Sequence, residues 1–358
     1  MNTTSLGNFS IEINQIREYL RHIKHIDAII FYTINETDSI IIKELIANLK
    51  SNYRTFGTDK KIFEYKAVVI TLYGILEKYT ESWIKEFLDE LANLVTDYNK
   101  IDDKIKNCHF DLSIKLINTI SSKELAKFQH INKEKILSNL NRCITEPNNY
   151  KFNTDAFILS SGNLKHAKIT EMLSNINISL NDGLKKSQSL IQYLQSEFQK
   201  EGIANQKGDA LYFKINDLVD RRNIIAHGAD VIDDLLDSSI LESYIDFLEV
   251  YCKSIFETFR QELISKEILT NYVKIKVIRN VWRKSIIGFE IENYTLKIND
   301  IIIVETSSGY FLKKPILEIQ VNDITYSVLE IKDKIDVAIR VDPVISSGQS
   351  FYIAKTSN

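Results

Sequence analysis

The sequence predicts two domains of different class, an all-α helical bundle over residues 1–268 and a small β-barrel over residues 269–358. The chain has 358 residues, which is more than one typical domain holds. Up to about residue 268, apolar residues recur at three- and four-residue spacing, as in amphipathic helices. Beyond that point the spacing becomes two and β-branched residues dominate, as in strands. The fold class is therefore α followed by β.

Three stretches of the first region have the clearest helical period, at residues 9–30, 61–95 and 240–264. Polar breaks are expected to separate the helices: NETDS at 35–39, TEPNN at 145–149, SSGN at 160–163 and KEGIANQKGD at 200–209. The triplet Asn181-Asp182-Gly183 marks a further turn or helix boundary.

The second region predicts short strands at regular spacing, which is typical of a barrel or sandwich of about 85 residues. The alternating stretches are YVKIKVIR, SIIGFEIEN, DIIIVETS, ILEIQV, ITYSVLEI, KIDVAIRV and SFYIAK. We expect the two domains to join directly near residues 266–273, because no Gly-, Ser- or Pro-rich linker lies there.

Composition narrows the class of protein. The net charge is −3, and residues 271–358 carry 12 basic and 10 acidic side chains against 33 and 38 in the rest of the chain. No strong basic field is present, which disfavours a protein that wraps DNA without regard to sequence but leaves room for local phosphate contacts. The three cysteines lack metal-ligand spacing and predict reduced, partly buried thiols. No signal peptide and no apolar run of about 18 residues is visible, so we expect a cytoplasmic protein without a membrane span.

The most unusual stretch is INDLVDRRNIIAHGADVIDDLL at residues 215–236, where a polar cluster interrupts an apolar helical pattern. Arg222 and His227 form an Arg-x4-His pair within it. Spacing alone is a weak signal, because Arg17 and His22 repeat it on an ordinary amphipathic helix. The apolar neighbours of the Arg222 cluster predict that its backbone lies against a core, where polar atoms need partners.

Helix geometry limits what this cluster does alone. Asn223 and His227 are four residues apart and share one face, whereas Arg222 and His227 differ by roughly 140°. One helix therefore does not bring both groups to a single phosphate, but a two-fold partner or a distorted turn at Gly228 does. A purely structural network, with the arginines paired to Asp220 or Asp230 and a satisfied histidine, remains an alternative.

The stretch DLVDRRNIIAHG at residues 217–228 resembles the RNxxxH signature of HEPN domains. Two further segments are similar to that family, KAVVITLYGILEKYTESWIKEFL at residues 66–88 and SGNLKHAKITEMLSNINISL at residues 161–180, so the resemblance covers roughly residues 60–265. It implies a metal-independent endoribonuclease that needs no cofactor. It also implies that the motif lies near the start of a late helix. The helical domain is further expected to form a homodimer in which the two motifs face each other.

The resemblance implies that Arg222 and His227 are catalytic and that Asn223 orients the histidine or the phosphate. An imidazole moves protons near neutral pH, and a guanidinium offers fixed positive charge to a phosphate. Arg221 is interpreted as a structural residue or an RNA-backbone contact, and Asp220 as the partner of an arginine.

Glu77 stands in an apolar helical stretch together with Tyr73 and Trp83. Its alternatives are a salt-bridged structural role and a role in holding Arg222 in place. Tyr73 and Trp83 are predicted core residues, and the separate histidines His109, His130 and His166 are assigned surface or core roles.

Residues 296–354 resemble the second, β-barrel domain of translational GTPases. Asn299 and Lys334 replace turn glycines of that pattern, and no Gly-x4-Gly-Lys-Ser/Thr loop occurs in the chain. The likeness implies a recognition module for tRNA or a translation component. A dimerisation or capping domain is the alternative.

The functional hypothesis is thus a HEPN endoribonuclease that acts as a toxin or anti-phage defence effector and cuts RNA, tRNA among the candidates, to 2′,3′-cyclic phosphate ends. An antitoxin or a translation component is a further candidate partner. The alternative is a catalytically inactive HEPN module that binds RNA or protein.

Overall fold

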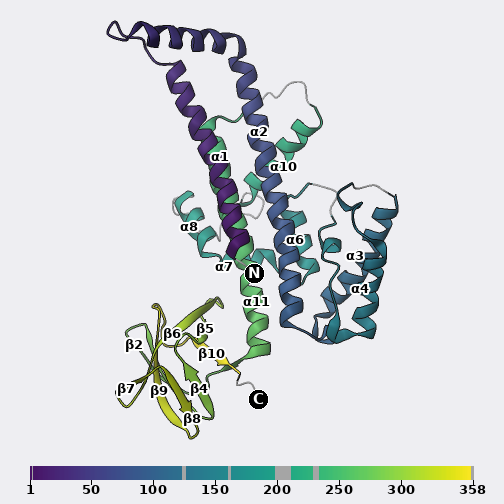
Figure 1. Cartoon of the computed structure of the whole chain (residues 1–358), viewed down its shortest axis with the longest axis vertical. Helices are drawn as coiled ribbons and strands as arrows, with labels where there is room; N and C mark the ends of the chain where they lie inside the picture. The colour runs from purple at the N-terminus through teal and green to yellow at the C-terminus, as the bar shows by residue number, and fades with distance from the viewer. Residues whose placement is uncertain (2, 123–125, 160–162, 198–210, 229–233, 356–358) are drawn as a thin grey trace. The chain divides into compact units, whose positions relative to one another are not determined.

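We describe a computed structural model of the whole chain, in which all residues are described except 2, 123–125, 160–162, 198–210, 229–233 and 356–358. The chain divides into two compact units (Figure 1). The first comprises Met1–Asp89 and Asp97–Phe259, and the second comprises Glu90–Thr96 and Arg260–Asn358. The predicted order, helices first and strands after, is confirmed.

The first unit is helical. Its helices are α1 (Thr3–Ile30), α2 (Ile40–Leu94), α3 (Asp103–Ser122), α4 (Lys133–Thr145), α5 (Thr154–Phe157), α6 (His166–Asn175), α7 (Leu180–Lys186), α8 (Gln188–Glu197), α10 (Phe213–Ala226) and α11 (Ser238–Asn271), with short 3₁₀ turns η1 (Tyr98–Lys100), η2 (Ala126–Phe128) and η3 (Pro147–Asn149). Helices α2 and α11 both extend into the second unit, which holds Glu90–Thr96 and Arg260–Asn358.

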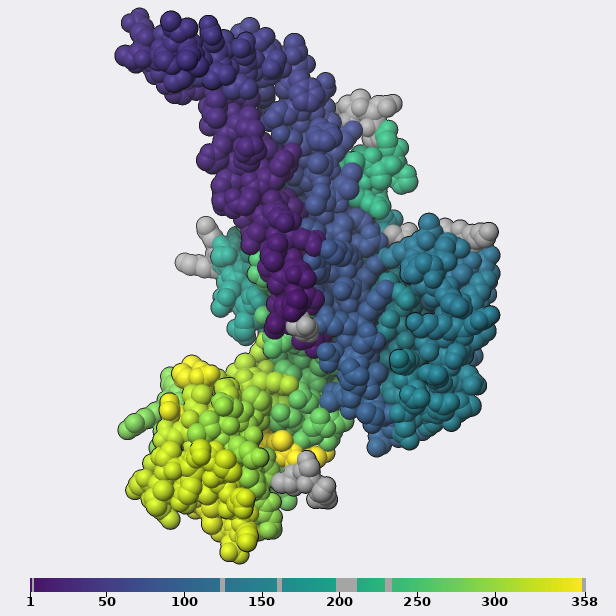
Figure 2. All heavy atoms as spheres, in the orientation of Figure 1, coloured from purple at the N-terminus to yellow at the C-terminus, as the bar shows by residue number. Residues whose placement is uncertain are grey.

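Helix α1 lies side by side with the greater part of α2, whose first part runs across the end of α1, and α3 and α4 lie on the other side of α2 (Figures 1 and 2). The periodic apolar residues of α1 face the core, which explains why this helix forms. Phe9 and Trp83 meet edge to face at 5.6 Å, and Trp83 packs on Phe256 of α11 at 5.3 Å. These fully buried rings make α2 a fixed support for the helices around it.

The lobe formed by α3, α4 and α5 encloses a buried polar network. His109 is fully buried, and its Nε2 accepts the backbone N–H of Asn153 at 2.9 Å. The side chain of Asn153 donates to Ser113 and accepts from Asn139. Burial lowers the pKa of His109 to about 4, so the ring is neutral, as its acceptor role requires. Of the surface and core roles considered for this histidine, the structure shows the core one.

Two of the predicted breaks are confirmed, since α1 and α2 are separated by residues 31–39 and α4 ends at Thr145. The predicted breaks at 160–163 and 200–209 fall almost wholly outside the described residues. The triplet at residues 181–183 lies in the first turn of α7, which begins at Leu180, so of the two predicted alternatives the helix boundary is confirmed. A Cβ at Gly183 would meet the side chain of Thr258 at 2.3 Å. The glycine is needed there because α7 packs closely on α11.

The second unit carries the strands. They are β1 (Tyr272–Lys274), β2 (Ile278–Trp282), β3 (Ile286–Ile291), β4 (Tyr294–Lys297), β5 (Ile301–Glu305), β6 (Phe311–Val321), β7 (Ile324–Tyr326), β8 (Val328–Ile331), β9 (Ile335–Val341) and β10 (Ser350–Ala354). The main sheet has the order β1-β10-β5-β6-β9-β3-β2, with β7 on β6, while β4 pairs with β8.

Every strand pair in the described part of the chain is antiparallel, and the main sheet curls into a half-barrel around an apolar core that includes Phe289 and Phe351. The period-two pattern arises because alternate residues enter this core. The stretch predicted as one strand, residues 272–279, is divided between β1 and β2, and β4 was not predicted. Helix α11 ends at Asn271 and β1 begins at Tyr272, so helix passes into strand without a linker.

Candidate functional site

The polar cluster occupies the last turn of α10. Ile215, Leu218 and Val219 anchor this helix in the core, which leaves the following residues at its exposed end. The helix stops at Ala226 and Gly228 has a positive φ of 71°, a conformation that glycine adopts without strain. The motif thus lies at the end of its helix, and not near the start as the resemblance implied.

The two neighbouring arginines have opposite surroundings. Arg221 donates to Asp217 at 2.5 Å, to the Tyr65 hydroxyl at 3.1 Å, and to both the backbone and the carboxylate of Asp234 at 2.8 and 2.7 Å. Its side chain is only 13% exposed. Burial alone would lower the pKa of Arg221, but these hydrogen bonds raise it above the ordinary value. Arg221 is therefore an anchor that ties α10 to α2 and to the residues after the motif.

Arg222 makes no ion pair with any carboxylate among the residues that the structure describes. Its guanidinium instead lies 4.4 Å from the centre of the Tyr73 ring on α2. Tyr73 is only 2% exposed, so the ring is a fixed platform. The charge of Arg222 is held in place without being neutralised.

Asn223 lies between Arg222 and the segment before α6. Arg222 Nη1 donates to Asn223 Oδ1 at 3.0 Å, and Asn223 Nδ2 donates to Asn163 Oδ1 at 2.7 Å. These two bonds fix the orientation of the Asn223 amide. Asn163 is the residue that sequence reasoning missed here, because only the tertiary fold brings residues 163 and 223 together.

His227 is exposed at the C-terminal end of α10. Its backbone N–H donates to the Asn223 carbonyl at 2.9 Å. Within the described parts of the chain its imidazole has no hydrogen-bond or ion-pair partner. The site therefore combines an accessible imidazole with an arginine whose charge is not compensated by a carboxylate.

The profile of the RiboL-PSP-HEPN family matches residues 37–261, more than half of the chain. The chain belongs to this HEPN family. Members of the HEPN class are nucleases or RNA-binding modules, so this places the protein in that broad functional class. Comparisons with curated proteins and with solved structures gave no match.

The HEPN match begins in the loop before α2 and ends inside α11, so it includes both Tyr73 and the motif. Tyr73 was assigned to the core, and it is buried, but its ring also carries Arg222. Burial, and then the Glu77 carboxylate, raise the pKa of Tyr73, while the Arg222 charge opposes this. The phenol is therefore neutral at physiological pH.

Glu77 lies one turn beyond Tyr73 on α2 and is half-buried. In the described structure it forms neither a hydrogen bond nor an ion pair with Arg222. Its charge raises the pKa of Tyr73. The side chain that directly positions Arg222 is therefore an aromatic ring and not the predicted carboxylate.

Asp220 pairs with Lys165 at 2.7 Å and not with an arginine. The backbone N–H of His166 donates to Asn216 Oδ1 at 3.0 Å, and the His166 ring stacks on Tyr212 with centres 3.5 Å apart. The N-terminal end of α6 thus lies along α10. Asp230, the other carboxylate considered as a partner, lies outside the described residues.

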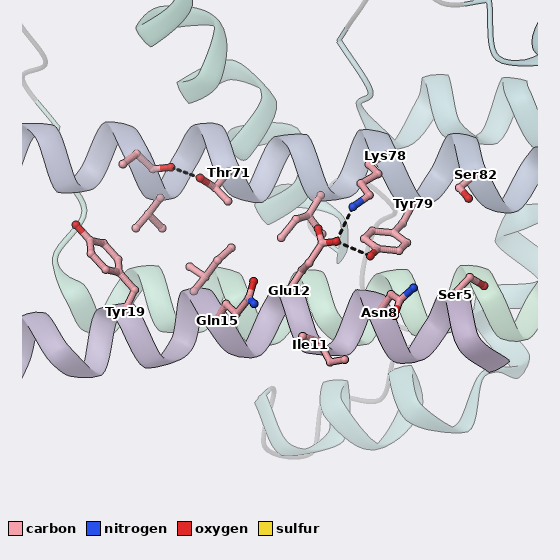
Figure 3. Close-up of a pocket in the computed structure, with 14 residues that line it drawn as sticks. Ser5, Asn8, Ile11, Glu12, Gln15, Tyr19, Thr71, Lys78, Tyr79 and Ser82 are labelled. Carbon is pink, nitrogen blue, oxygen red and sulfur yellow. Dashed lines mark hydrogen bonds and ion pairs between the residues drawn. The ribbon is translucent and has the colours of Figure 1, made fainter.

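A separate groove of about 850 Å³ lies between α1 and α2 (Figure 3). Glu12 points across it and accepts hydrogen bonds from Lys78 and Tyr79. No motif residue lines this groove. The helical positions that line it on α2, such as Thr71 and Lys78, face away from Tyr73 by roughly half a turn.

No group of three or more His, Cys, Asp or Glu side chains with metal-binding geometry occurs in the described part of the chain. In the same part, each helix is too short or too polar to cross a bilayer. The three cysteines are free thiols, Cys108 half-buried and Cys143 and Cys252 buried, as predicted.

Proposed function

We propose that this HEPN protein is a metal-independent endoribonuclease whose catalytic groups are Arg222 and His227, with Asn223 in a supporting role. One observation carries the proposal. The last turn of α10 presents an exposed imidazole without a partner and a guanidinium without a carboxylate, both in the described structure of a HEPN chain.

The chemistry follows from these two groups. The 2′-hydroxyl of RNA attacks the adjacent phosphorus, a new O2′–P bond forms, and the P–O5′ bond breaks. His227 accepts the proton of the 2′-hydroxyl and returns it to the departing 5′-oxygen. Arg222 stabilises the negative charge that builds up on the phosphoryl oxygens. The products are a 2′,3′-cyclic phosphate and a 5′-hydroxyl.

The active form in this proposal is a homodimer. Arg222 and His227 are five residues apart and differ by roughly 140° around the helix, so they do not converge on one phosphate within a single chain. Two copies related by a two-fold axis supply the arginine of one and the histidine of the other. Light scattering over a concentration series is expected to give the mass of a dimer, and a monomer at every concentration contradicts this arrangement.

The experiment for the proposed reaction uses purified protein, total RNA and a chelator. Cleavage is expected to continue in EDTA and to leave 2′,3′-cyclic phosphate ends, because the acid-base work is done by an imidazole. A complete loss of cleavage in EDTA that Mg²⁺ restores contradicts the mechanism. Binding of RNA without any cleavage supports the inactive HEPN module instead.

In the cell, the proposed role is that of a toxin or anti-phage effector that acts on RNA, with tRNA as a candidate substrate and the β unit as its recognition module. Expression of the wild-type chain is then expected to arrest bacterial growth, and His227→Ala is expected to relieve the arrest. Equal toxicity of the two chains contradicts a role based on cleavage at this motif.

A further inference from the structure

One face of α10 is lined by residues 163–166. Asn216, Asp220 and Asn223 are spaced by four and three residues and therefore share a face of the helix. Each contacts this segment, through the N–H of His166, the ammonium of Lys165 and the amide of Asn163 respectively. His227 is the next position on the same face, but none of the described contacts with residues 163–166 involves its side chain.

The contact between Arg222 and Tyr73 restricts the arginine without occupying its donors. A guanidinium that stacks on a ring keeps its N–H groups in the plane, where they remain able to meet a phosphate. A carboxylate partner would take two of those donors and cancel the charge. In the described structure only Nη1 of Arg222 has a hydrogen-bond acceptor, the Asn223 amide at 3.0 Å.

A guanidinium lying on a ring can still rotate within its own plane. The side-chain amides of Asn223 and Asn163, called the amide chain below, limit this rotation of Arg222. Asn223 accepts from Arg222 and donates to Asn163, so its amide is held at both ends. Asn163 has a left-handed backbone with φ of 61°, which asparagine tolerates better than most residues. The left-handed backbone thus determines the position of the Asn163 amide, from which Asn223 and then Arg222 are oriented.

We propose that Tyr73 and Asn163 are positioning residues for Arg222, the ring fixing the plane of the guanidinium and the amide chain fixing its direction within that plane. This rests on the proposed function, in which Arg222 stabilises the cleaved phosphate. Neither residue touches RNA, and both act through the motif.

The first test compares Tyr73→Phe with Tyr73→Leu. Phenylalanine keeps the ring and removes only the hydroxyl, so kcat for RNA cleavage is expected to stay within about twofold of wild type. Leucine removes the π face and is expected to lower kcat about tenfold with KM nearly unchanged, because the arginine acts in the transition state. In an Arg222→Ala background, Tyr73→Leu is expected to cause no further loss. An additive loss in that background, or equal losses for Phe and Leu, overturns the proposal.

The second test uses Asn163, which is exposed, so that folding is not at risk. Asn163→Gly keeps the left-handed backbone but removes the amide, and it is expected to lower kcat severalfold. Asn163→Asp retains the acceptor for Asn223 and is expected to keep more activity than the glycine variant. Glycine and aspartate variants that are both as active as wild type overturn the role of Asn163.

A spectroscopic measurement separates this proposal from the proposed function. The Cζ atom of Arg222 lies 4.4 Å from the centre of the Tyr73 ring, so the ring current is expected to act on the neighbouring Nε–Hε group. The Nε–Hε resonance, assigned by its loss in Arg222→Lys, is expected to move in Tyr73→Leu and to stay in Tyr73→Phe. If wild type cuts no RNA but the resonance moves in this way, ribonuclease activity fails and the positioning stands. A resonance that does not respond to Tyr73→Leu overturns the positioning, whatever the activity.

Discussion

Two Arg-x4-His pairs with identical spacing occupy different settings in this molecule. Arg17 on α1 donates to Asp246 and Glu249 of α11, at 2.8 Å each. Arg222 on α10 has no carboxylate partner in the described structure and lies on an aromatic ring. The spacing of a motif is therefore uninformative alone, and what separates a candidate catalytic arginine from a structural one is whether its charge is already compensated.

The largest expected effect is on catalysis at the second pair. His227→Ala removes the proton-transfer group and Arg222→Ala removes the charge that stabilises the transition state, so each is expected to lower the rate of RNA cleavage about 10²- to 10⁴-fold. Circular dichroism and light scattering are expected to match wild type, because the His227 side chain is exposed and has no hydrogen bond or ion pair with any described residue. His22→Ala is the matched control and is expected to cut at the wild-type rate. Variants of residues 222 and 227 that fold, dimerise and still cleave RNA would place the active site elsewhere.

The next effect sharpens the contrast between Arg221 and Arg222. Arg221→Ala leaves the Asp217 carboxylate and the Tyr65 hydroxyl without this donor, and it is expected to lower the free energy of unfolding by about 2 to 4 kcal/mol. Urea denaturation measures this loss. At a temperature where the variant remains folded, RNA cleavage is expected to stay within a few-fold of wild type. A fully stable Arg221→Ala protein without activity would instead make Arg221 part of the catalytic site.

A third effect concerns the buried His109. Its Nε2 accepts from the Asn153 N–H and its Nδ1 lies 3.2 Å from the Tyr98 hydroxyl, whereas the imidazole of His227 has no hydrogen-bond partner among the described residues. The pKa of His109 is lowered to about 4 in the folded chain, against an ordinary 6.5. The unfolded chain therefore binds a proton first as the pH falls, so stability that is complete above about pH 7 is lost between pH 6.5 and 4. The loss at pH 5 amounts to about 2 kcal/mol.

Thermal unfolding at pH 7 and pH 5 measures this term by comparison with His109→Gln, which keeps an acceptor for the Asn153 N–H but does not titrate. The glutamine variant is expected to lose about 2 kcal/mol less than wild type over this interval. An equal loss in both proteins would show that His109 is not the group responsible.

The smallest effect is at Arg17. Arg17→Ala removes two ion pairs in which the arginine side chain is 27% exposed, so the expected loss of stability is about 1 kcal/mol. Cleavage of RNA is expected to be unchanged when measured well below the melting temperature. A loss of cleavage at this position as large as that at Arg222 would remove the distinction between the two pairs.

Much of the fold could be predicted from the sequence because the spacing of apolar residues differs between helices and strands. The pattern missed β4 because its four residues, although they alternate in burial, are too few to establish a period of two. It also left open whether residues 181–183 form a turn or a helix boundary, since a glycine required by close packing against Thr258 looks the same in sequence as a glycine in a turn. The predicted domain boundary at residues 268 and 269 stays a prediction.

For the candidate site, the sequence predicted the motif residues themselves but not the residues that contact them in the fold. The positions of Arg222, Asn223 and His227 follow from the motif, and their separation around the helix follows from its pitch. The partners of these residues do not, because Tyr73 is 149 positions away in sequence from Arg222 and only the packing of α10 on α2 brings them together. Glu77, the charged residue that sequence reasoning chose on α2, is one turn from the residue that makes the contact.

The central claim is that Arg222 of one copy and His227 of another form one catalytic site. Arg222→Ala and His227→Ala chains carrying different tags are co-expressed, and the mixed dimer is isolated by both tags. This dimer has one intact pair of the two that wild type contains, so it is expected to recover about half of the wild-type rate of RNA cleavage, although each variant alone is inactive. A verified mixed dimer that remains as inactive as its parents would contradict a site shared between two copies.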